Sequence, residues 1–393
     1  MRPRILILTE AADFHAITVS EALIRRGAEV TLWATSDFPT RSEESVRFGS
    51  ANEPTFHICG PDLVLSDPRF DVVWRRRPAY VLAPDLLHPA DRAFAESECE
   101  LFRRSLFQIL APEAFWVNPP AGAAQAGSKM IQQRVAGRIG IKSPETIFTN
   151  SPSEIRAFLK RRGKIVYKPF CPAVWRSRES DWLPYTALLT EDALVSDELL
   201  RLTPGIFQEL VPKAYELRVT VIGRRTFAAK VLSQSTEKGK LDWRKAYDEL
   251  RFEPASLPPE VEHQCFALLD ELGLVFGCFD FIVTPTGEHV FLEVNEAGQF
   301  LFIERYCGLP LLDAFTEFLF QGNVEFEWSE EAITTRYTDP EFEQAVTARA
   351  REFRASHVVA PEALIDEEEQ PQRRRPRKVS RRAKRAANQE GQK

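Results

Sequence analysis

The chain has 393 residues, 44% of them hydrophobic, and 28 phenylalanines, enough to bury a large core in two or three domains. Its first residues enter an apolar strand without the long apolar stretch and cleavage site of a signal peptide, so we expect a cytoplasmic protein and exclude a membrane protein. The net charge is −6, the six cysteines lack disulfide or metal spacing, and the six histidines are too dispersed for a zinc site.

A β-α-β opening of the parallel-sheet type is predicted at the N-terminus. Residues 4–8 and 29–33 are strand-like, and 18–26 show helical periodicity. The right-handed crossover leaves the loop after the first strand at the sheet edge where open α/β sheets bind ligands. Asp13 and His15 in this loop face a substrate or, alternatively, serve as a helix cap and a surface residue. No Gly-x-Gly-x-x-Gly follows the strand, so a dinucleotide site is not supported.

The next predicted strand ends in Arg75-Arg-Arg77, which face an anionic partner if they lie on the same rim. A charged helix with an apolar stripe follows at 91–110 and is interpreted as scaffold. Small residues at 121–127 form a linker to a helix at 128–140, which Lys129 opens. Taken alone, Lys129 is explained more simply as a solvated lysine at a helix start.

Two short strands carry further polar candidates. A β-branched strand ends in Lys168-Pro169, because proline cannot continue the ladder. The apolar strand at 205–212 carries Gln208 and Glu209, and Glu216 follows it. By itself, Lys168 would signify little.

A hairpin with two cations is predicted next. The strand-like runs 217–222 and 226–233 are joined by a short turn, and centring that turn on Arg224 places Arg218 opposite Lys230. Two fixed cations on one sheet face suit a transferring phosphoryl group, whose developing charge they stabilise. The alternative is a solvated sheet face, although like charges directly opposite each other would destabilise the pairing.

A second hairpin brings acidic residues together. It joins strands at 276–283 and 290–295. A turn at 286–287 places Asp280 directly opposite Glu293, with β-carbons roughly 5 Å apart.

Asn295 lies two residues beyond Glu293, so the sequence predicts three oxygen ligands on one face, with Gln299 just downstream. Two carboxylates and an amide suit Mg²⁺, which prefers oxygen ligands and usually keeps water and substrate phosphates in its remaining positions. The alternative is two solvated acids on a half-exposed sheet.

The order of these residues closely resembles that of the ATP-grasp ligases: Lys129, Lys168-Pro169, Gln208-Glu209, Glu216, Arg218, Lys230, Asp280 and Glu293-Val-Asn295. Within that group, the chain looks most like the microviridin-type, or graspetide, maturases of ribosomally made peptides, over about residues 4 to 320. The motifs of this closer resemblance are Asp13-Phe-His15, Val72-Val-Trp-Arg-Arg-Arg-Pro78, Trp116-Val-Asn-Pro119, Glu216-Leu-Arg218, Asp242-Trp-Arg244, Gly298-Gln299 and Ile303-Glu304.

The resemblance implies an α/β protein. An N-terminal parallel-sheet pre-ATP-grasp domain would precede an ATP-grasp fold whose two α+β subdomains clasp ATP. The predicted units are the pre-ATP-grasp domain at 1–117, subdomains at 118–204 and 205–325, a C-terminal helical segment at 326–360 and a tail at 361–393.

The resemblance also implies a role for each candidate residue. The implied ATP site consists of Lys129 and Lys168 at the phosphates, Glu209 and Leu210 at the adenine, Glu216 at the ribose, and Gln208. Arg218 and Lys230 would steady the γ-phosphate and the acyl phosphate. The implied Mg²⁺ ligands are Asp280, Glu293 and Asn295.

Two positions depart from the family pattern. Residues 170–179 stand where many ATP-grasp enzymes have a glycine-rich phosphate flap, so Arg176, Ser177 or Arg178 would have to substitute. Glu296-Ala297 follows Asn295 where the peptide ligases commonly have a proline.

The implied activity is ATP-dependent carboxylate ligation through an acyl phosphate, forming ester or amide crosslinks between side chains of a leader-guided precursor peptide. A second enzyme hypothesis is a glutamate-type ligase that adds a free amino acid to a protein or small carboxylate. A third, from another class, is a nucleotide-responsive protein that binds RNA or peptide. The sequence leaves a homodimer and the choice between ester and amide open.

The C-terminal residues are strongly basic, whereas the rest of the chain is acidic. Residues 371–393 hold seven Arg, three Lys and one Glu, a net charge of +9 that leaves −15 for the rest of the chain. Acidic residues precede this run, and the segment from about Pro361 is poor in aromatics, so we predict a disordered tail. A solvated tail is favoured over one that binds nucleic acid, because no aromatics or folded motif accompany the basic residues.

Overall fold

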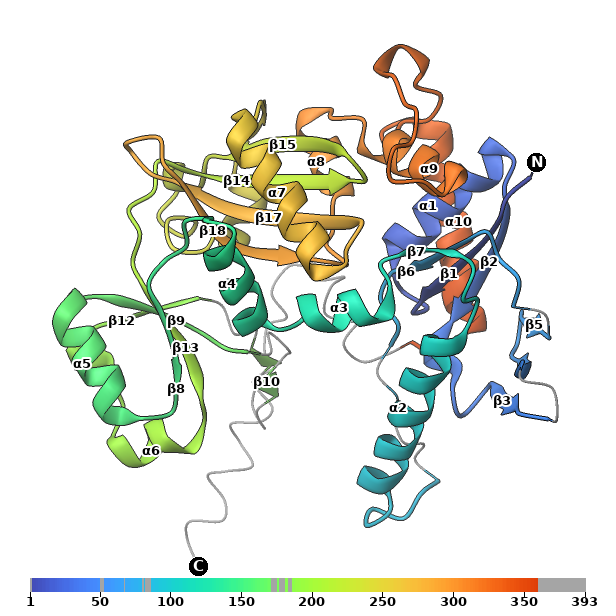
Figure 1. Cartoon of the computed structure of the whole chain (residues 1–393), viewed down its shortest axis with the longest axis horizontal. Coiled ribbons are helices and arrows are strands. Elements are labelled where there is room, and N and C mark those ends of the chain that lie inside the picture. The colour runs from blue at the N-terminus through green and yellow to red at the C-terminus, as the bar shows by residue number, and fades with distance from the viewer. Residues whose placement is uncertain are drawn as a thin grey trace, which may run out of the picture.

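Four parallel strands form the sheet at the N-terminal end, in the order β2-β1-β6-β7 (Figure 1). Their bounds are Arg4–Thr9 for β1, Glu29–Ala34 for β2, Val72–Arg75 for β6 and Phe115–Val117 for β7. β1 lies inside the sheet and is buried almost throughout, as expected of a parallel strand covered on both faces. Helix α1 (Phe14–Arg26) connects β1 to β2, so the predicted β-α-β opening is confirmed.

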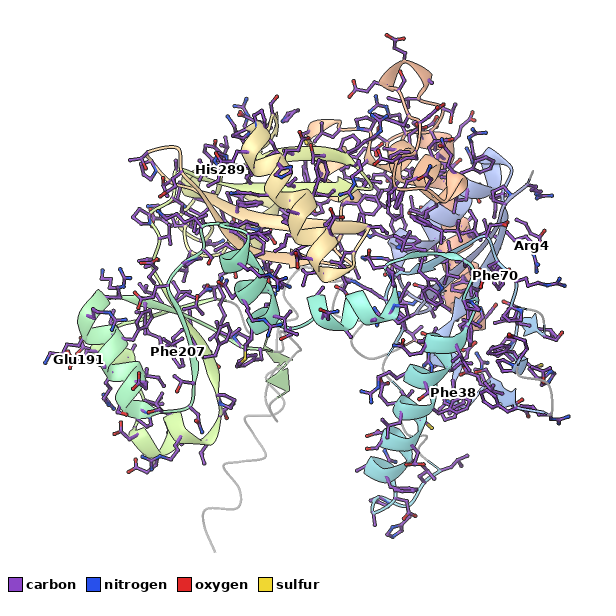
Figure 2. The ribbon with its side chains drawn as sticks, viewed as in Figure 1. Arg4, Phe38, Phe70, Glu191, Phe207 and His289 are labelled. Carbon is purple, nitrogen blue, oxygen red and sulfur yellow. The ribbon has the colours of Figure 1, made fainter. Side chains whose placement is uncertain are left out.

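Helix α2 (Arg92–Ile109) and a small antiparallel sheet flank the parallel sheet. The strands of the small sheet are β3 (Glu43–Arg47), β4 (Thr55–Cys59) and β5 (Val64–Leu65). Trp33, Phe56 and Phe107 belong to the apolar cluster that joins these elements. Phe70, labelled in Figure 2, lies beside Arg4 of β1, with the guanidinium carbon 5.3 Å from the ring centroid.

Helices α3 (Pro120–Ala126) and α4 (Lys129–Arg138) lead from the parallel sheet to the rest of the molecule (Figure 1). A four-stranded antiparallel sheet follows, ordered β12-β9-β13-β8. The bounds are β8 Thr146–Thr149, α5 Pro152–Arg162, β9 Ile165–Lys168, β10 Trp175–Arg176, β11 Asp181–Trp182, β12 Ala187–Leu189, α6 Asp197–Leu202 and β13 Gly205–Glu209. Because β13 pairs with both β8 and β9, this sheet extends beyond the division predicted between residues 204 and 205.

The largest sheet has five antiparallel strands, ordered β16-β15-β14-β17-β18. Their bounds are β14 Tyr215–Ile222, β15 Arg225–Val231, β16 Phe252–Ala255, β17 Phe276–Val283 and β18 His289–Asn295. Helix α7 (Pro259–Leu272) covers one face of this sheet through a core that includes Leu268, Phe279 and Phe281. Short 3₁₀ segments lie at Thr35–Asp37, Glu191–Ala193, Ser233–Ser235, Trp243–Glu249 and Glu330–Ala332.

The C-terminal helices join the five-stranded sheet to the parallel sheet. They are α8 (Leu301–Cys307), α9 (Leu311–Gln321) and α10 (Pro340–Ser356). Phe315 of α9 contacts Trp74 of β6, with ring centroids 4.9 Å apart, and Phe276 of β17, with centroids 5.0 Å apart. One apolar core therefore runs through both sheets and fixes them relative to each other.

The computed structural model describes residues 2–49, 53–66, 68–79, 81, 86–170, 175–176, 181–182 and 186–359. The predicted tail at 361–393 and most of the segment that replaces the glycine-rich flap lie outside these residues. Within the described ranges, no helix combines the length and the apolar character needed to cross a membrane.

Candidate active site

The acidic hairpin β17–β18 pairs Asp280 with Glu293, as predicted. Closer to the turn the register would pair Asp280 with Leu292, but a bulge after Asp280 adds one residue to β18. Phe291 and Val294 both enter the core beneath α7, although regular alternation would put residues three apart on opposite faces. The bulge permits this and leaves Glu293 on the face opposite that core.

The basic hairpin β14–β15 has a different register from the predicted one. Gly223 and Arg224 form a two-residue turn, with Gly223 at φ +54°, so Arg218 lies opposite Ala229 rather than Lys230. A shift of one residue turns every side chain to the other face. On that face, the Lys230 ammonium lies 5.1 Å from the ring centroid of Tyr215. The predicted register is wrong, and the structure does not bring Lys230 to the face that carries Arg218.

Strand β14 also pairs with β17, and there Arg218 lies directly opposite Asp280. Arg218 Nη1 donates a hydrogen bond to Asp280 Oδ2 at 2.7 Å, and both side chains are largely buried. This face of the sheet brings together the predicted residues Glu216, Arg218, Asp280, Glu293 and Asn295. We take this face as the candidate active site.

Two lysines from other elements belong to the same electrostatic cluster. Lys129 opens α4, and its ammonium forms an ion pair with Glu293. Burial and the neighbouring charge of Lys168 lower the pKa of Lys129 to about 8. Burial likewise lowers the pKa of Lys168, at the end of β9, to about 8, against the attraction of Asp242. Both lysines are therefore charged at neutral pH and lose their protons within reach of mildly alkaline solution.

Gln208 and Lys168 lie on one face of the smaller sheet, because both alternate with residues whose side chains pack on α5. Phe207, labelled in Figure 2, is one of these core residues. Gln208 is buried, and its Nε2 donates to Thr146 Oγ1 at 3.0 Å. The structure thus places Gln208 on the same side of its sheet as a predicted phosphate ligand.

The Glu209 side chain is directed to the opposite face of the smaller sheet. Its Oε1 accepts from the Glu145 backbone N–H at 2.9 Å, and its Oε2 pairs with Arg162 at 2.9 Å. Leu210 follows the end of β13 and is 40% exposed. The Glu209 carboxylate therefore binds Glu145 and Arg162 on the face opposite Gln208. Leu210, the next residue in the chain, is partly exposed to solvent.

Two buried amides, to which the sequence assigned no role, fix the acidic strands. Gln132 of α4 accepts from Val294 N at 2.9 Å and donates to Val294 O at 2.8 Å, as a neighbouring strand would. Asn118, just after β7, accepts from Phe276 N at 3.0 Å and donates to Phe276 O at 2.9 Å and Glu296 O at 2.8 Å. A polar residue inside an otherwise apolar helix face was the available signal for Gln132.

Further charged residues lie near Glu216 and Lys168. Lys213 Nζ donates to Glu216 Oε1 at 2.8 Å; burial raises the pKa of Glu216, and Lys213 opposes this shift. Burial alone would raise the pKa of Asp242 as well, but hydrogen bonds from Arg244 hold it at about 2. The sequence supplied Asp242 and Arg244 only as a family motif, and no local pattern marks Lys213.

Asp13 and His15 of the N-terminal motif both bind other residues of this protein. Asp13 caps α1, the second of the two predicted alternatives, and pairs with Arg76 at 3.0 Å. His15 is not free on the surface, because its Nε2 accepts from the backbone N–H groups of Phe300 at 3.2 Å and Leu301 at 3.3 Å. Burial, with the nearby Arg76 charge, holds the pKa of His15 well below its usual range, which keeps the ring a hydrogen-bond acceptor.

Each of the predicted metal ligands already has a hydrogen-bond or ion-pair partner within the protein. Asp280 is bound to Arg218 and Glu293 to Lys129, while Asn295 Oδ1 accepts a backbone N–H at 3.1 Å. A carboxylate offers about four acceptor sites, so both acids retain capacity for a cation. In the part of the chain that the structure describes, no three His, Cys, Asp or Glu side chains are grouped to hold a metal. The donor set fits Mg²⁺ when Asn295 and oxygens from outside the protein complete it.

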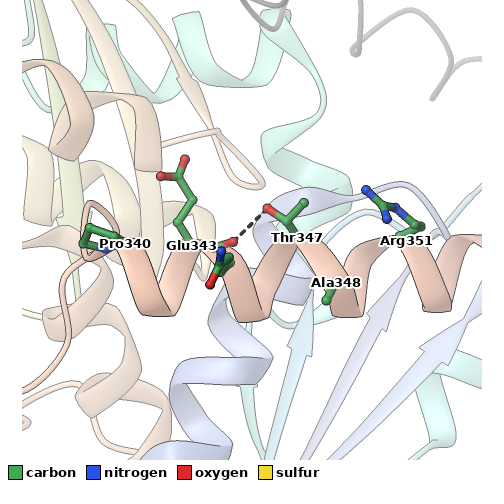
Figure 3. Close-up of a pocket in the computed structure, with 6 residues that line it drawn as sticks. Pro340, Glu343, Thr347, Ala348 and Arg351 are labelled. Atoms are coloured by element: carbon green, nitrogen blue, oxygen red, sulfur yellow. Dashed lines mark hydrogen bonds between the residues drawn. The ribbon is translucent and has the colours of Figure 1, made fainter.

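A shallow pocket lies on α10, away from these residues (Figure 3). Pro340, Glu343, Thr347 and Arg351 help to line it, and the Thr347 hydroxyl donates to Glu343 O at 2.7 Å. None of the predicted site residues lines it, so it is not part of the candidate active site.

Comparison with known proteins identifies the fold. No protein-family model and no curated protein matches the chain. A solved RiPP-associated ATP-grasp ligase of Chryseobacterium gregarium, in complex with ADP and a leader and core peptide, is 27% identical, with a TM-score of 0.72. That match covers 81% of this chain and 96% of the ligase. The fold is that of an ATP-grasp ligase. The predicted α/β architecture, the predicted resemblance and the assignment as an enzyme are confirmed.

Two macrocyclases of Microcystis aeruginosa are similar to this chain to about the same degree. MdnC, bound with its precursor peptide MdnA, is 29% identical, with a TM-score of 0.71 over 80% of this chain and 98% of MdnC. MdnB is also 29% identical, with a TM-score of 0.68 over 81% of this chain and 99% of MdnB. The present chain thus spans nearly the whole length of these macrocyclases and extends beyond the matched region.

Proposed function

We propose that the protein is an ATP- and Mg²⁺-dependent peptide ligase that forms ester or amide crosslinks between side chains of a ribosomally made precursor peptide. The observation that carries this proposal is the shared face of β14, β17 and β18, where three carboxylates, an amide and an arginine lie near two lysines from other elements. Support for a peptide substrate comes from the solved ligases, which contain precursor peptides.

ATP would bind between groups from both antiparallel sheets. Lys129 and Lys168 would pair with its phosphates, since both are cationic at neutral pH and both are attracted by Asp280. Gln208, Leu210 and the Glu209 backbone would meet the base, and Glu216 the ribose. Mg²⁺ held by Asp280, Glu293 and Asn295 would neutralise charge on the phosphates, and a phosphate that attracts Lys129 would compete with its ion pair to Glu293.

The chemistry then requires positioning and charge stabilisation rather than a covalent enzyme intermediate. A peptide carboxylate oxygen attacks the γ-phosphorus, the bond to the β-phosphate oxygen breaks, and ADP leaves an acyl phosphate behind. A hydroxyl or amine of the same peptide attacks the acyl carbon, loses its proton and expels inorganic phosphate. Arg218, anchored by Asp280 at 2.7 Å, would stabilise the negative charge in both steps.

The test is the intact mass of a candidate precursor peptide, encoded beside this gene, after incubation with the protein, ATP and Mg²⁺. The proposal predicts the loss of one water per bond together with ADP formation. A mass gain would instead establish the addition of a free amino acid. An unchanged peptide with ATP consumed would overturn the peptide assignment in favour of a small carboxylate.

A further inference from the structure

The segment at 296–300, between β18 and α8, has three consecutive carbonyls bound by arginines. Arg76 Nη1 donates to Ala297 O and, at 3.4 Å, to Gly298 O. Arg218 Nη2 donates to Gln299 O at 3.1 Å. The segment that follows the predicted metal ligands is therefore bound on one side from the N-terminal unit and on the other from the active-site strand.

Arg76 reaches this segment from the end of β6, where it is only 1% exposed. Its Nε pairs with Asp13, the cap of α1, at 3.0 Å. A buried guanidinium is costly to desolvate unless charge and hydrogen bonds compensate, and here the compensation comes from Asp13 and the segment's carbonyls. These contacts fix both the position of Arg76 and the direction of its N–H groups.

On the far side of the segment, Arg218 lies in direct contact with the backbone. A β-carbon built on Gly298 would lie 3.1 Å from Arg218 Nη2 and 2.5 Å from Cys278 Cβ, which explains the need for glycine there. Arg218 also donates to Asp280 at 2.7 Å. An uninterrupted series of contacts thus runs from Asp13 through Arg76 and the segment to Arg218 and Asp280.

The neighbours of Arg76 act on the same segment. Arg75 lies 3.6 Å from Glu296, and Arg77 Nε donates to Ala297 O at 3.3 Å. The anionic partner predicted for these arginines is therefore, at least in part, the chain's own segment. At its other end, His15 accepts from Phe300 N at 3.2 Å.

We propose that Arg76 is a positioning residue for the ligase reaction: held by Asp13, it fixes the 296–300 segment and thereby the orientation of Arg218 toward Asp280. This inference rests on the proposed function, because it assigns Arg218 to the reacting phosphate. It also gives the N-terminal unit a direct effect on the chemistry, since displacement of a positioned group by about 1 Å can cost a hundredfold in rate.

The experiment compares Arg76→Met with Arg103→Met, two losses of a buried arginine from the N-terminal unit. Arg103 is 3% exposed; it donates to Thr35 O at 2.8 Å, lies 4.0 Å from Glu44 and packs over the rings of Phe38 and Phe107, all outside the 296–300 segment. The assay measures kcat and KM for ATP from ADP formation with the precursor peptide. Melting temperature and the hydrogen exchange of the 297–301 amides are recorded for both variants.

Arg76→Met should lower kcat about 100-fold. It should change KM for ATP by no more than about twofold, because Lys129 and Lys168, which are proposed to bind the ATP phosphates, are untouched. Its 297–301 amides should exchange faster than in the wild type. Arg103→Met should lower the melting temperature without either effect. In an Arg218→Ala background, adding Arg76→Met should lower kcat little further, since the two residues act in series.

Equal losses of kcat in Arg76→Met and Arg103→Met, or unchanged kcat in Arg76→Met, would overturn the proposal. Failure of the wild type to form ADP with the peptide would reject the proposed function instead. In that case the exchange rates still decide: unchanged exchange at 297–301 in Arg76→Met would show that Arg76 does not fix the segment.

Discussion

The two faces of the five-stranded sheet differ sharply, although both carry a cation on neighbouring strands. Arg218 lies on the face with Asp280 and Glu293, whereas Lys230 lies on the face that packs beneath α7. A register shift of one residue separates the two outcomes. A turn several residues away, Gly223-Arg224, therefore decides which cation lies on the face that carries Asp280.

The largest effect should come from the site face. Arg218→Ala removes the donor to Asp280 and Gln299, and should lower ADP formation at least about 1,000-fold, the scale of losing a group that stabilises transferring phosphate charge. Steady-state ADP release with peptide present measures this, with melting temperature as the control for folding. Activity within tenfold of the wild type would mean that the face has been wrongly assigned.

A smaller, graded effect should follow pH. Burial lowers the pKa of both Lys129 and Lys168 to about 8, so both are charged below that pH and neutral above it. KM for ATP should therefore rise by about fivefold for each lysine between pH 8 and pH 9, and stay nearly flat from pH 6 to 7. Lys129→Arg, which stays charged throughout, should remove part of this dependence. A KM for ATP that does not change between pH 6 and pH 9 would show that these lysines do not bind the ATP phosphates.

The smallest effect should come from the opposite face. Lys230→Ala removes a cation that lies 5.1 Å from the Tyr215 ring and should leave kcat and KM within about twofold of the wild type. The lost contact should cost about 0.5–1 kcal/mol of unfolding free energy, the usual worth of a cation–π pair. Chemical denaturation measures the cost. A loss of activity approaching that of Arg218→Ala would erase the contrast between the two faces.

Sequence reasoning went furthest where chemistry and periodicity agreed. Asp280 and Glu293 were placed opposite each other, but only because a bulge near Leu292 offsets the difference between the assumed turn and the real one. Bulges and turn lengths depend on packing at a distance, here the burial of both Phe291 and Val294, and no local pattern encodes them.

The supporting residues were harder to predict for a related reason. Gln132, Asn118 and Arg76 act on backbone groups of segments more than a hundred residues away in the chain. Such contacts exist only once the sheets are assembled, so a polar residue in an apolar stretch signals that a partner exists without naming it. His15 and Asp13 illustrate the same limit, because the sequence placed both in a loop at the sheet edge but could not name Phe300 and Arg76 as their partners.

We propose above that the face of β14, β17 and β18 that carries Arg218 and Asp280 joins peptide side chains at the expense of ATP. The most direct test of this proposal is the mass of a precursor peptide incubated with ATP, Mg²⁺ and either the wild-type protein or Asp280→Asn. We expect the loss of one water per bond with the wild type and an unmodified peptide with the variant, which should still fold. Dehydration of the peptide by Asp280→Asn at a rate near that of the wild type would contradict the proposal.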